Sequence, residues 1–156
     1  MAHGSMVFDQ YGIRQSIYGG PYYELHRECR GQGIKLVKMA REIQLPCDVD
    51  IPTADFSTPY PDVLRNGLKR ALAHMMDGND LAVGCMGGIG RTGLFLAAMA
   101  KVQGVKDPVA YVRSCYMPHA VETQEQQQYI ADLDVADIQW QLKWLPNFWL
   151  KRRWAA

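Results

Sequence analysis

The sequence lacks the features of a membrane-spanning, fibrous or strongly charged protein. Its 156 residues contain no apolar run near the ~18 residues that a membrane-spanning helix needs. Neither sign of charge dominates, because 17 Lys and Arg stand against 16 Asp and Glu, so no overall field attracts nucleic acid or an anionic membrane. Hydrophobic residues make up 48%, which is enough to bury the core of one ordinary domain.

Closely spaced cysteines are also absent. The four cysteines are Cys29, Cys47, Cys85 and Cys115, and none forms a CxxC pair. This spacing favours reduced thiols and a cytoplasmic location over a disulfide framework. The pairs His26/Cys29 and Cys115/His119 lack the arrangement of a zinc finger, so we expect no metal site.

The chain shows no internal repeat, no long linker and no signal peptide. Residues 1–5 precede a second methionine, Met6, and have the composition of an expression scar. We therefore expect one domain over residues 6–156.

Apolar periodicity predicts alternating strands and helices from residue 34 onward. The expected strands are 34–39, 49–51 (stopped by Pro52) and the fully apolar run 81–83. The expected helices are 60–76, 92–102, 107–113 and one long amphipathic helix over 124–144. This pattern predicts an α/β domain with a central, mainly parallel sheet flanked by helices, while the residues before 34 give no clear assignment.

The C-terminal segment from Trp144 to Trp154 interleaves four aromatic side chains with Lys and Arg. The simplest interpretation is that the aromatic rings pack on the domain and the basic groups face water. A basic aromatic stripe is also typical of a surface that lies on a membrane or stacks on nucleic acid.

The chemically informative stretch is Leu-Ala-Val-Gly-Cys-Met-Gly-Gly-Ile-Gly-Arg-Thr-Gly at residues 81–93. Its glycines let backbone N–H groups turn inward around an anion, and the following helix directs its positive end at the same point. Arg91 adds a planar fork that matches two phosphate oxygens. Cys85 in this field is expected to be a thiolate nucleophile, with Thr92 placed to donate a hydrogen bond to its sulfur.

This loop resembles the signature loop of the cysteine-dependent protein tyrosine phosphatase superfamily, and residues 88–93 are similar to the phosphotyrosine-specific branch. The resemblance implies a protein tyrosine phosphatase-like fold and a phosphocysteine intermediate on Cys85. It also implies that Arg91 and the loop bind the substrate phosphate without a metal or other cofactor. The loop residues are Met86, Gly87, Gly88, Ile89 and Gly90.

Two further segments extend the resemblance, which covers residues 49–129. Asp55-Phe56-Ser57-Thr58-Pro59 resembles the mobile loop that carries the general acid, although its tryptophan is absent. Asp48, Asp50 and Asp62 are nearby alternatives for this role. The segment 120–126 resembles the one that positions the hydrolytic water, with Gln126, assisted by Glu122, at the matching positions.

The departures from the family pattern bear on activity and specificity. Gly84 stands where the family usually has a histidine, and the chain is short, as in compact dual-specificity enzymes. The resemblance implies hydrolysis of phosphotyrosine in proteins or peptides, with phosphoserine and phosphothreonine left open. The alternatives are a phosphoinositide or RNA 5′-phosphatase with the same chemistry, or an inactive phosphate-binding module. No nucleic-acid partner is expected, and the oligomeric state is open.

Overall fold

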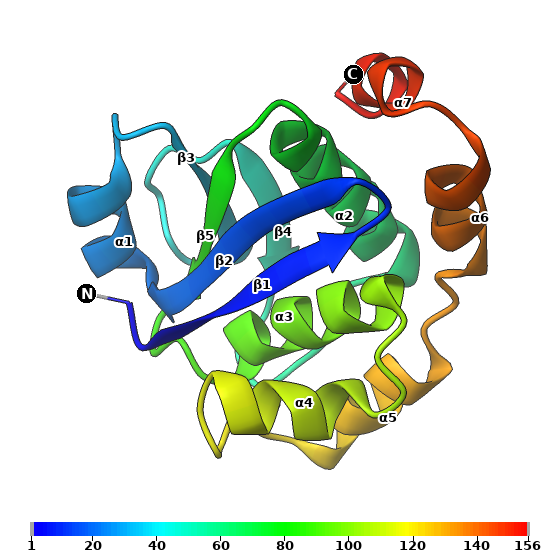
Figure 1. Ribbon diagram of the computed structural model, residues 1–156. Coiled ribbons are helices and arrows are strands. Elements are labelled where there is room, and N and C mark those ends of the chain that lie inside the picture. Colours follow the sequence, from blue (N-terminus) through cyan, green and yellow to red (C-terminus); the bar gives the residue numbers. More distant parts are fainter. Residues whose placement is uncertain (1, 156) are drawn as a thin grey trace.

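The computed structural model describes residues 2–155 and contains one five-stranded sheet in the order β1-β2-β5-β3-β4 (Figure 1). The strands are β1 (Gly4–Gln10), β2 (Ile13–Pro21), β3 (Ile34–Ala40), β4 (Val49–Thr53) and β5 (Asp80–Cys85). β1 and β2 pair antiparallel, whereas the β2/β5, β5/β3 and β3/β4 pairs are parallel. The predicted α/β class with a mainly parallel sheet is therefore confirmed.

Helices cover both faces of this sheet (Figure 1). They are α1 (Tyr22–Cys29), α2 (Pro61–Met76), α3 (Gly90–Gln103), α4 (Pro108–Cys115), α5 (Gln124–Asp132), α6 (Ala136–Trp144) and α7 (Asn147–Trp154). α1 and α2 pack on one face, and α3 packs on the other with α4 and α5 outside it. α6 packs against α3, and α7 packs against α2. The almost wholly buried α3 is the central helix of its layer.

The N-terminal hairpin of β1 and β2 is the main element that sequence analysis missed. Met6 and Phe8 face the core while Val7 and Asp9 are exposed, which is the alternation of a half-buried strand. The turn residues Tyr11 and Gly12 both have positive φ angles, as a tight two-residue hairpin requires. Residues 4 and 5, assigned above to an expression scar, extend β1. That assignment stays a prediction, and residue 1 lies outside the described residues.

β4 continues through Pro52 to Thr53, so the prediction that proline ends this strand is wrong. The reason is its position, because β4 is an edge strand that pairs only with β3. A proline on an edge strand removes no hydrogen bond from the sheet when its nitrogen faces away from the partner strand.

The single long helix predicted over residues 124–144 is also wrong, because it breaks into α5 and α6. Leu133 has an extended conformation and is buried together with Val135. The Asp134 carboxylate accepts a hydrogen bond from the backbone N–H of Ala136 at 3.0 Å and so starts the second helix. At this point, burying the side chains of Leu133 and Val135 contributes more to stability than continuing the helix would.

The expectation that the C-terminal aromatic side chains pack on the domain holds only for Trp154, which is 5% exposed. Trp144, Phe148 and Trp149 remain 63%, 75% and 42% exposed. α7 is held instead by the buried Leu150 and Trp154 against α2. Within residues 2–155, no helix is long and apolar enough to cross a bilayer.

Truncation of a core side chain in α2 should measurably destabilise the fold. Leu68 is fully buried, so Leu68→Ala is expected to cost about 2–5 kcal/mol in the free energy of unfolding. The control Val63→Ala lies on the same helix at a 36% exposed position and should change stability by less than about 1 kcal/mol. Urea unfolding measures both, and similar losses for the two variants would contradict the described burial.

Candidate active site

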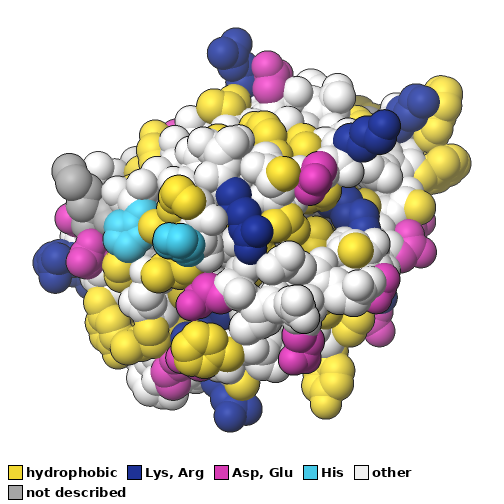
Figure 2. Space-filling model, turned by 90° about the horizontal axis from the view of Figure 1, so that it is seen from below, with side chains coloured by type: hydrophobic (Ala, Val, Ile, Leu, Met, Phe, Trp, Pro, Cys, Tyr) yellow, Lys and Arg dark blue, Asp and Glu magenta, His cyan; other side chains and the backbone are white. Residues whose placement is uncertain are grey.

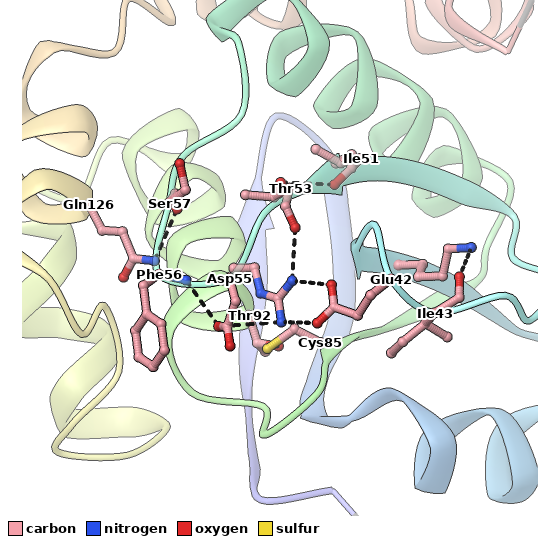
Figure 3. Close-up of polar contacts among 12 residues, drawn as sticks. Glu42, Ile43, Ile51, Thr53, Asp55, Phe56, Ser57, Cys85, Thr92 and Gln126 are labelled. Carbon is pink, nitrogen blue, oxygen red and sulfur yellow. Dashed lines mark hydrogen bonds and ion pairs between the residues drawn. The ribbon is translucent and has the colours of Figure 1, made fainter.

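The candidate site lies at the edge of the sheet where the parallel strands β4 and β5 end (Figure 3). Cys85 is the last residue of β5, and Arg91 and Thr92 lie in the first turn of α3. Asp55 follows the end of β4 by two residues. Carboxyl ends of parallel strands are where ligand sites form in α/β folds, because loops and helix N-termini converge there.

Cys85 and Thr92 contact each other directly inside the protein. The Thr92 hydroxyl donates a hydrogen bond to the Cys85 sulfur at 3.1 Å, and Thr92 is completely buried. Cys85 is only 3% exposed. A hydrogen bond to the sulfur stabilises a thiolate and makes the sulfur a better leaving group. The position predicted for Thr92 is therefore the one observed.

Arg91 is the most constrained polar side chain of the site, with 2% of its surface exposed. Its two terminal nitrogens donate to both carboxylate oxygens of Glu42 at 2.7 and 2.8 Å. Nη1 also donates to the carbonyl oxygen of Thr53 at 2.8 Å. The buried Nε has no hydrogen-bond partner among the residues that the structure describes.

Glu42 was not predicted as a site residue. Its only signal in the sequence is an acidic residue in the loop between two strands, which is an ordinary surface pattern. The structure holds this loop in place through Lys38, whose ammonium donates to the carbonyl oxygens of Ile43 at 2.8 Å and Leu45 at 3.2 Å. The Tyr22 hydroxyl donates to the carbonyl oxygen of Pro46 at 2.6 Å.

Asp55 reaches the same guanidinium from the opposite side. Its Oδ1 atom lies 3.5 Å from Nη2 of Arg91, and the Asp55 side chain is 55% exposed (Figure 3). The three competing acids are occupied elsewhere or face solvent: Asp48 accepts from the backbone of Leu36, Asp62 pairs with Arg65, and Asp50 is exposed. Among these four acids, Asp55 alone has a recorded contact with Arg91.

Gln126 links the Asp55 loop to the helix that follows the site. Its amide nitrogen donates to the carbonyl oxygen of Ser57 at 3.1 Å, and its amide oxygen accepts from the N–H of Thr123. Gln126 is fully buried. The Glu122 carboxylate lies where a side chain on Gly90 would be. Both side chains thus lie near the start of α3, while their predicted action on a water molecule stays a prediction.

The loop residues 86–90 between Cys85 and Arg91 take the conformation that their glycines permit. Gly88 has a φ of +73°, and a Cβ there would lie 2.5 Å from the backbone of Gly20. Its carbonyl oxygen accepts a hydrogen bond from the buried Tyr116 hydroxyl at 2.5 Å. Met86 is 47% exposed at the rim, and Ile89 is half-buried.

Gly84 has no space for a side chain, although the family that this loop resembles usually has a histidine at the matching position. A Cβ at this position would lie 2.7 Å from the carbonyl oxygen of Gly20 and 2.8 Å from Cα of Tyr22. The end of β2 therefore occupies the volume that a larger residue would need. Tyr116 donates a side-chain hydrogen bond to the carbonyl oxygen of Gly88 in the loop, and Thr92 donates one to the sulfur of Cys85.

The ionisation of the site follows from these contacts. The hydrogen bond from Arg91 lowers the pKa of Glu42 from 4.5 to about 2. Burial opposes the charge on Arg91, but Glu42, the Cys85 sulfur and Asp55 together raise its pKa. Partial desolvation also raises the pKa of the thiols of Cys29 and Cys47, which are half-buried, and of Cys115, which is exposed at the surface; this makes the three cysteines poorer nucleophiles.

No group of three or more His, Cys, Asp or Glu side chains within residues 2–155 is arranged to hold a metal ion. The positive charge and N–H donors of the site come from Arg91 and from the start of α3. These are the elements of an anion site.

Sequence comparisons identify relatives but no family model matches the chain. The uncharacterized protein MJECL20 of Methanocaldococcus jannaschii is 37% identical over 82 residues, which are 53% of this chain and 56% of the relative. The uncharacterized protein MJ0215 of the same organism is 34% identical over 82 residues, or 53% and 52% of the two chains. The chain thus spans about half the length of the curated relatives it matches.

Solved structures show which fold this is. The active form of Tk-PTP superimposes with a TM-score of 0.68 at 22% identity and covers 85% of this chain and 97% of its own. Kinase associated phosphatase, with its catalytic cysteine changed to serine, gives a TM-score of 0.64 at 14% identity. The match covers 92% of this chain and 96% of that protein. The PP-IP phosphatase SIW14 of S. cerevisiae gives a TM-score of 0.59 at 15% identity, and the match covers 96% of this chain and 93% of that protein. The chain shares the fold of these phosphatases, as the resemblance implied.

The Arg91–Glu42 pair predicts a specific dependence of stability on pH. Because the folded protein depresses the pKa of Glu42, its ionisation stabilises the fold fully above about pH 4.5 and loses this effect as pH falls toward 2. The stability advantage of the natural protein over Glu42→Gln should therefore be constant near neutral pH and shrink on acidification. Unfolding free energies measured at about pH 3 and about pH 7 test this. An advantage of equal size at both pH values would contradict the assignment.

Proposed function

We propose that this protein is a phosphomonoester hydrolase that acts through a phosphocysteine intermediate on Cys85. The supporting observation is the buried Nε donor of Arg91, which has no partner within the described part of the chain. It belongs to the same site as a cysteine sulfur that accepts a hydrogen bond from Thr92. A buried N–H without a partner is costly, so the arrangement fits a site that receives an oxyanion.

In the first step, the Cys85 thiolate attacks phosphorus in line with the leaving oxygen. The S–P bond forms as the P–O bond breaks, while Arg91 and the N–H groups of residues 86–90 hold the other phosphate oxygens. Asp55, in its protonated form, gives its proton to the departing phenolate or alkoxide. The contact between Asp55 and Arg91 supports this role, because Arg91 is the group proposed to bind the phosphate.

In the second step, a water molecule attacks the phosphocysteine. The P–O bond to water forms, the S–P bond breaks, and the Cys85 thiolate leaves with the help of the Thr92 hydrogen bond. Asp55, now ionised, takes a proton from the water. Gln126, with Glu122 beside it, orients this water in the proposed mechanism.

Phosphotyrosine in a protein or peptide is the proposed substrate. The rim of the site is apolar, with Phe56 59% exposed next to Asp55 and Met86 47% exposed on the phosphate loop. Such side chains suit an aromatic ring better than an inositol, whose polar hydroxyls need hydrogen bonds. The loop 86–90 also carries no lysine, which a polyphosphorylated inositol would favour.

The proposal is tested first by hydrolysis of para-nitrophenyl phosphate with a thiol reductant and EDTA present. Turnover is expected even though EDTA removes metal ions, because the proposed mechanism uses none. Folded, reduced protein without turnover would instead favour a phosphate-binding module. Comparison of kcat/KM on matched peptides of phosphotyrosine, phosphoserine and phosphothreonine, and on an inositol polyphosphate, then assigns the substrate class.

Substitution of the nucleophile should separate binding from turnover. Cys85→Ser is expected to lower kcat on the order of 10⁴-fold or more, as is typical when a covalent nucleophile is removed. Phosphate-ester binding should persist, because Arg91 and the loop N–H groups remain. Cys115→Ser, which changes an exposed thiol elsewhere, is the control and should keep full activity. Appreciable turnover by the Cys85 variant would rule out this residue as the nucleophile.

The role of Asp55 is tested by the dependence on the leaving group. A phenolate of pKa about 10 leaves slowly unless it is protonated, and a positioned acid typically contributes about 10²–10⁴-fold. Asp55→Asn should lower kcat by this factor on phosphotyrosine and much less on esters of acidic phenols. Asp62→Asn removes an exposed acid that pairs with Arg65 and should have no such effect. If the two variants behave alike, another group is the acid.

A further inference from the structure

Four large aromatic side chains form an exposed surface on α6 and α7, which we call the aromatic face. They are Trp140, Trp144, Phe148 and Trp149, with exposures of 57%, 63%, 75% and 42%. Side chains of this size are usually buried at least in part by their own domain, and several that stay exposed on two consecutive helices indicate a surface that contacts another phase or molecule. The site proposed above uses none of these residues.

Their placement follows from the two helices. Trp140 and Trp144 are four residues apart and therefore lie on one side of α6, opposite the buried Ile138 and Leu142. On α7, the buried Leu150 and Trp154 turn inward, which leaves Phe148 and Trp149 outward. The two groups are joined by the short connection at residues 145–146.

Basic side chains accompany the aromatic rings. The Lys143 ammonium lies 5.2 Å from the ring centre of Trp144, and the Arg153 guanidinium lies 5.0 Å from that of Trp149. Arg152 is exposed beside them. Residues 136–155 hold four Lys or Arg and one acid, Asp137, although the whole chain is nearly neutral. Figure 2 shows hydrophobic side chains beside Lys and Arg at its right-hand edge, the side on which α6 lies in Figure 1.

A groove of about 540 Å³ between α2, α6 and α7 adjoins this face. Lys69, Arg70 and Arg153 line it, together with one acid, Asp137. Its only aromatic lining residue is Trp154, whose ring is buried. Nucleic-acid bases need exposed rings inside the basic groove on which to stack, and these are missing here.

We propose that the aromatic face binds the surface of an anionic lipid bilayer. The tryptophan rings would lie at the headgroup level, Lys143 and Arg152 would pair with lipid phosphates, and the basic groove would accept one anionic headgroup. The aromatic face is apolar and has cations beside it. It therefore complements a negatively charged membrane interface in both polarity and charge. This proposal does not depend on the proposed enzymatic activity.

When this protein is bound to a membrane, its candidate active site would face the water. Lys151 pairs with Asp77 at 3.0 Å, just before β5, and Asn147 donates to the carbonyl oxygen of Tyr11 in the β1–β2 turn. Both anchors lie at the amino ends of β2 and β5, whereas Cys85 lies at the carboxyl end of β5, about 17 Å away along the strand. The enzyme would therefore act on phosphorylated molecules beside the membrane rather than on lipids beneath it.

The chain carries its own probe for this proposal, because all four of its tryptophans lie between residues 140 and 154. The full-length protein is mixed with vesicles of phosphatidylcholine alone or with added phosphatidylglycerol. We expect sedimentation with the anionic vesicles, a blue shift of tryptophan emission, and quenching by brominated acyl chains. High salt should weaken the binding. No binding to anionic vesicles at low salt would overturn the proposal.

Variants at exposed positions then locate the surface. Trp144→Ala combined with Phe148→Ala should abolish the binding, and each of Lys143→Gln and Arg152→Gln should weaken partitioning about five-fold. Two double variants on other surfaces are matched controls and should leave vesicle binding unchanged. One is Val7→Ala with Tyr23→Ala, and the other is Arg30→Gln with Lys106→Gln. Thermal unfolding and para-nitrophenyl phosphate turnover verify that each variant is folded.

Two other outcomes would replace the proposal. Dimerisation in sedimentation velocity that Trp144→Ala abolishes, without vesicle binding, would make the aromatic face an interface between copies of this chain. Binding of a single-stranded oligonucleotide without vesicle binding would assign the face to nucleic acid. Equal loss of vesicle binding in the test and control variants would show that the aromatic face is not the contact surface.

Discussion

A guanidinium that is 2% exposed needs neutralisation and hydrogen bonds from the protein, since an unpaired buried charge is strongly destabilising. Glu42 supplies the opposite charge to Arg91, and the carbonyl of Thr53 supplies a further acceptor. These contacts join α3, the end of β4 and the loop after β3 at one point. They leave the buried Nε donor of Arg91 without a hydrogen bond among the described residues.

Close backbone packing is the second constraint on the site, and it accounts for the departure at Gly84. The backbone of residues 20–22 lies against Gly84 and Gly88, so neither position has room for a side chain. The loop at residues 86–90 is supported from this side by main chain and from the other side by the Tyr116 hydroxyl. A histidine next to the cysteine would displace the end of β2.

The two ends of the parallel strands carry different surfaces. Loops and the first turn of α3 converge at the carboxyl ends, where Cys85, Arg91 and Asp55 meet. The amino ends receive α7, which is anchored there by Lys151 and Asn147. The candidate active site and the anchors of α7 thus lie at opposite ends of the sheet.

By itself, the sequence determined the strand, loop and helix around Cys85, because glycine positions, apolar runs and a helix start are local features of residues 81–93. It also predicted α2 and singled out Asp55, whose carboxylate lies 3.5 Å from Arg91, while the role of Asp55 as the acid stays a prediction. Only the tertiary structure decided that Glu42 neutralises Arg91, that Leu133 interrupts a helix, and that the C-terminal aromatic rings stay exposed. These outcomes depend on which distant segments supply a charge, an acceptor or a buried surface. Periodicity along the chain records which side chains are apolar but not which partner covers them.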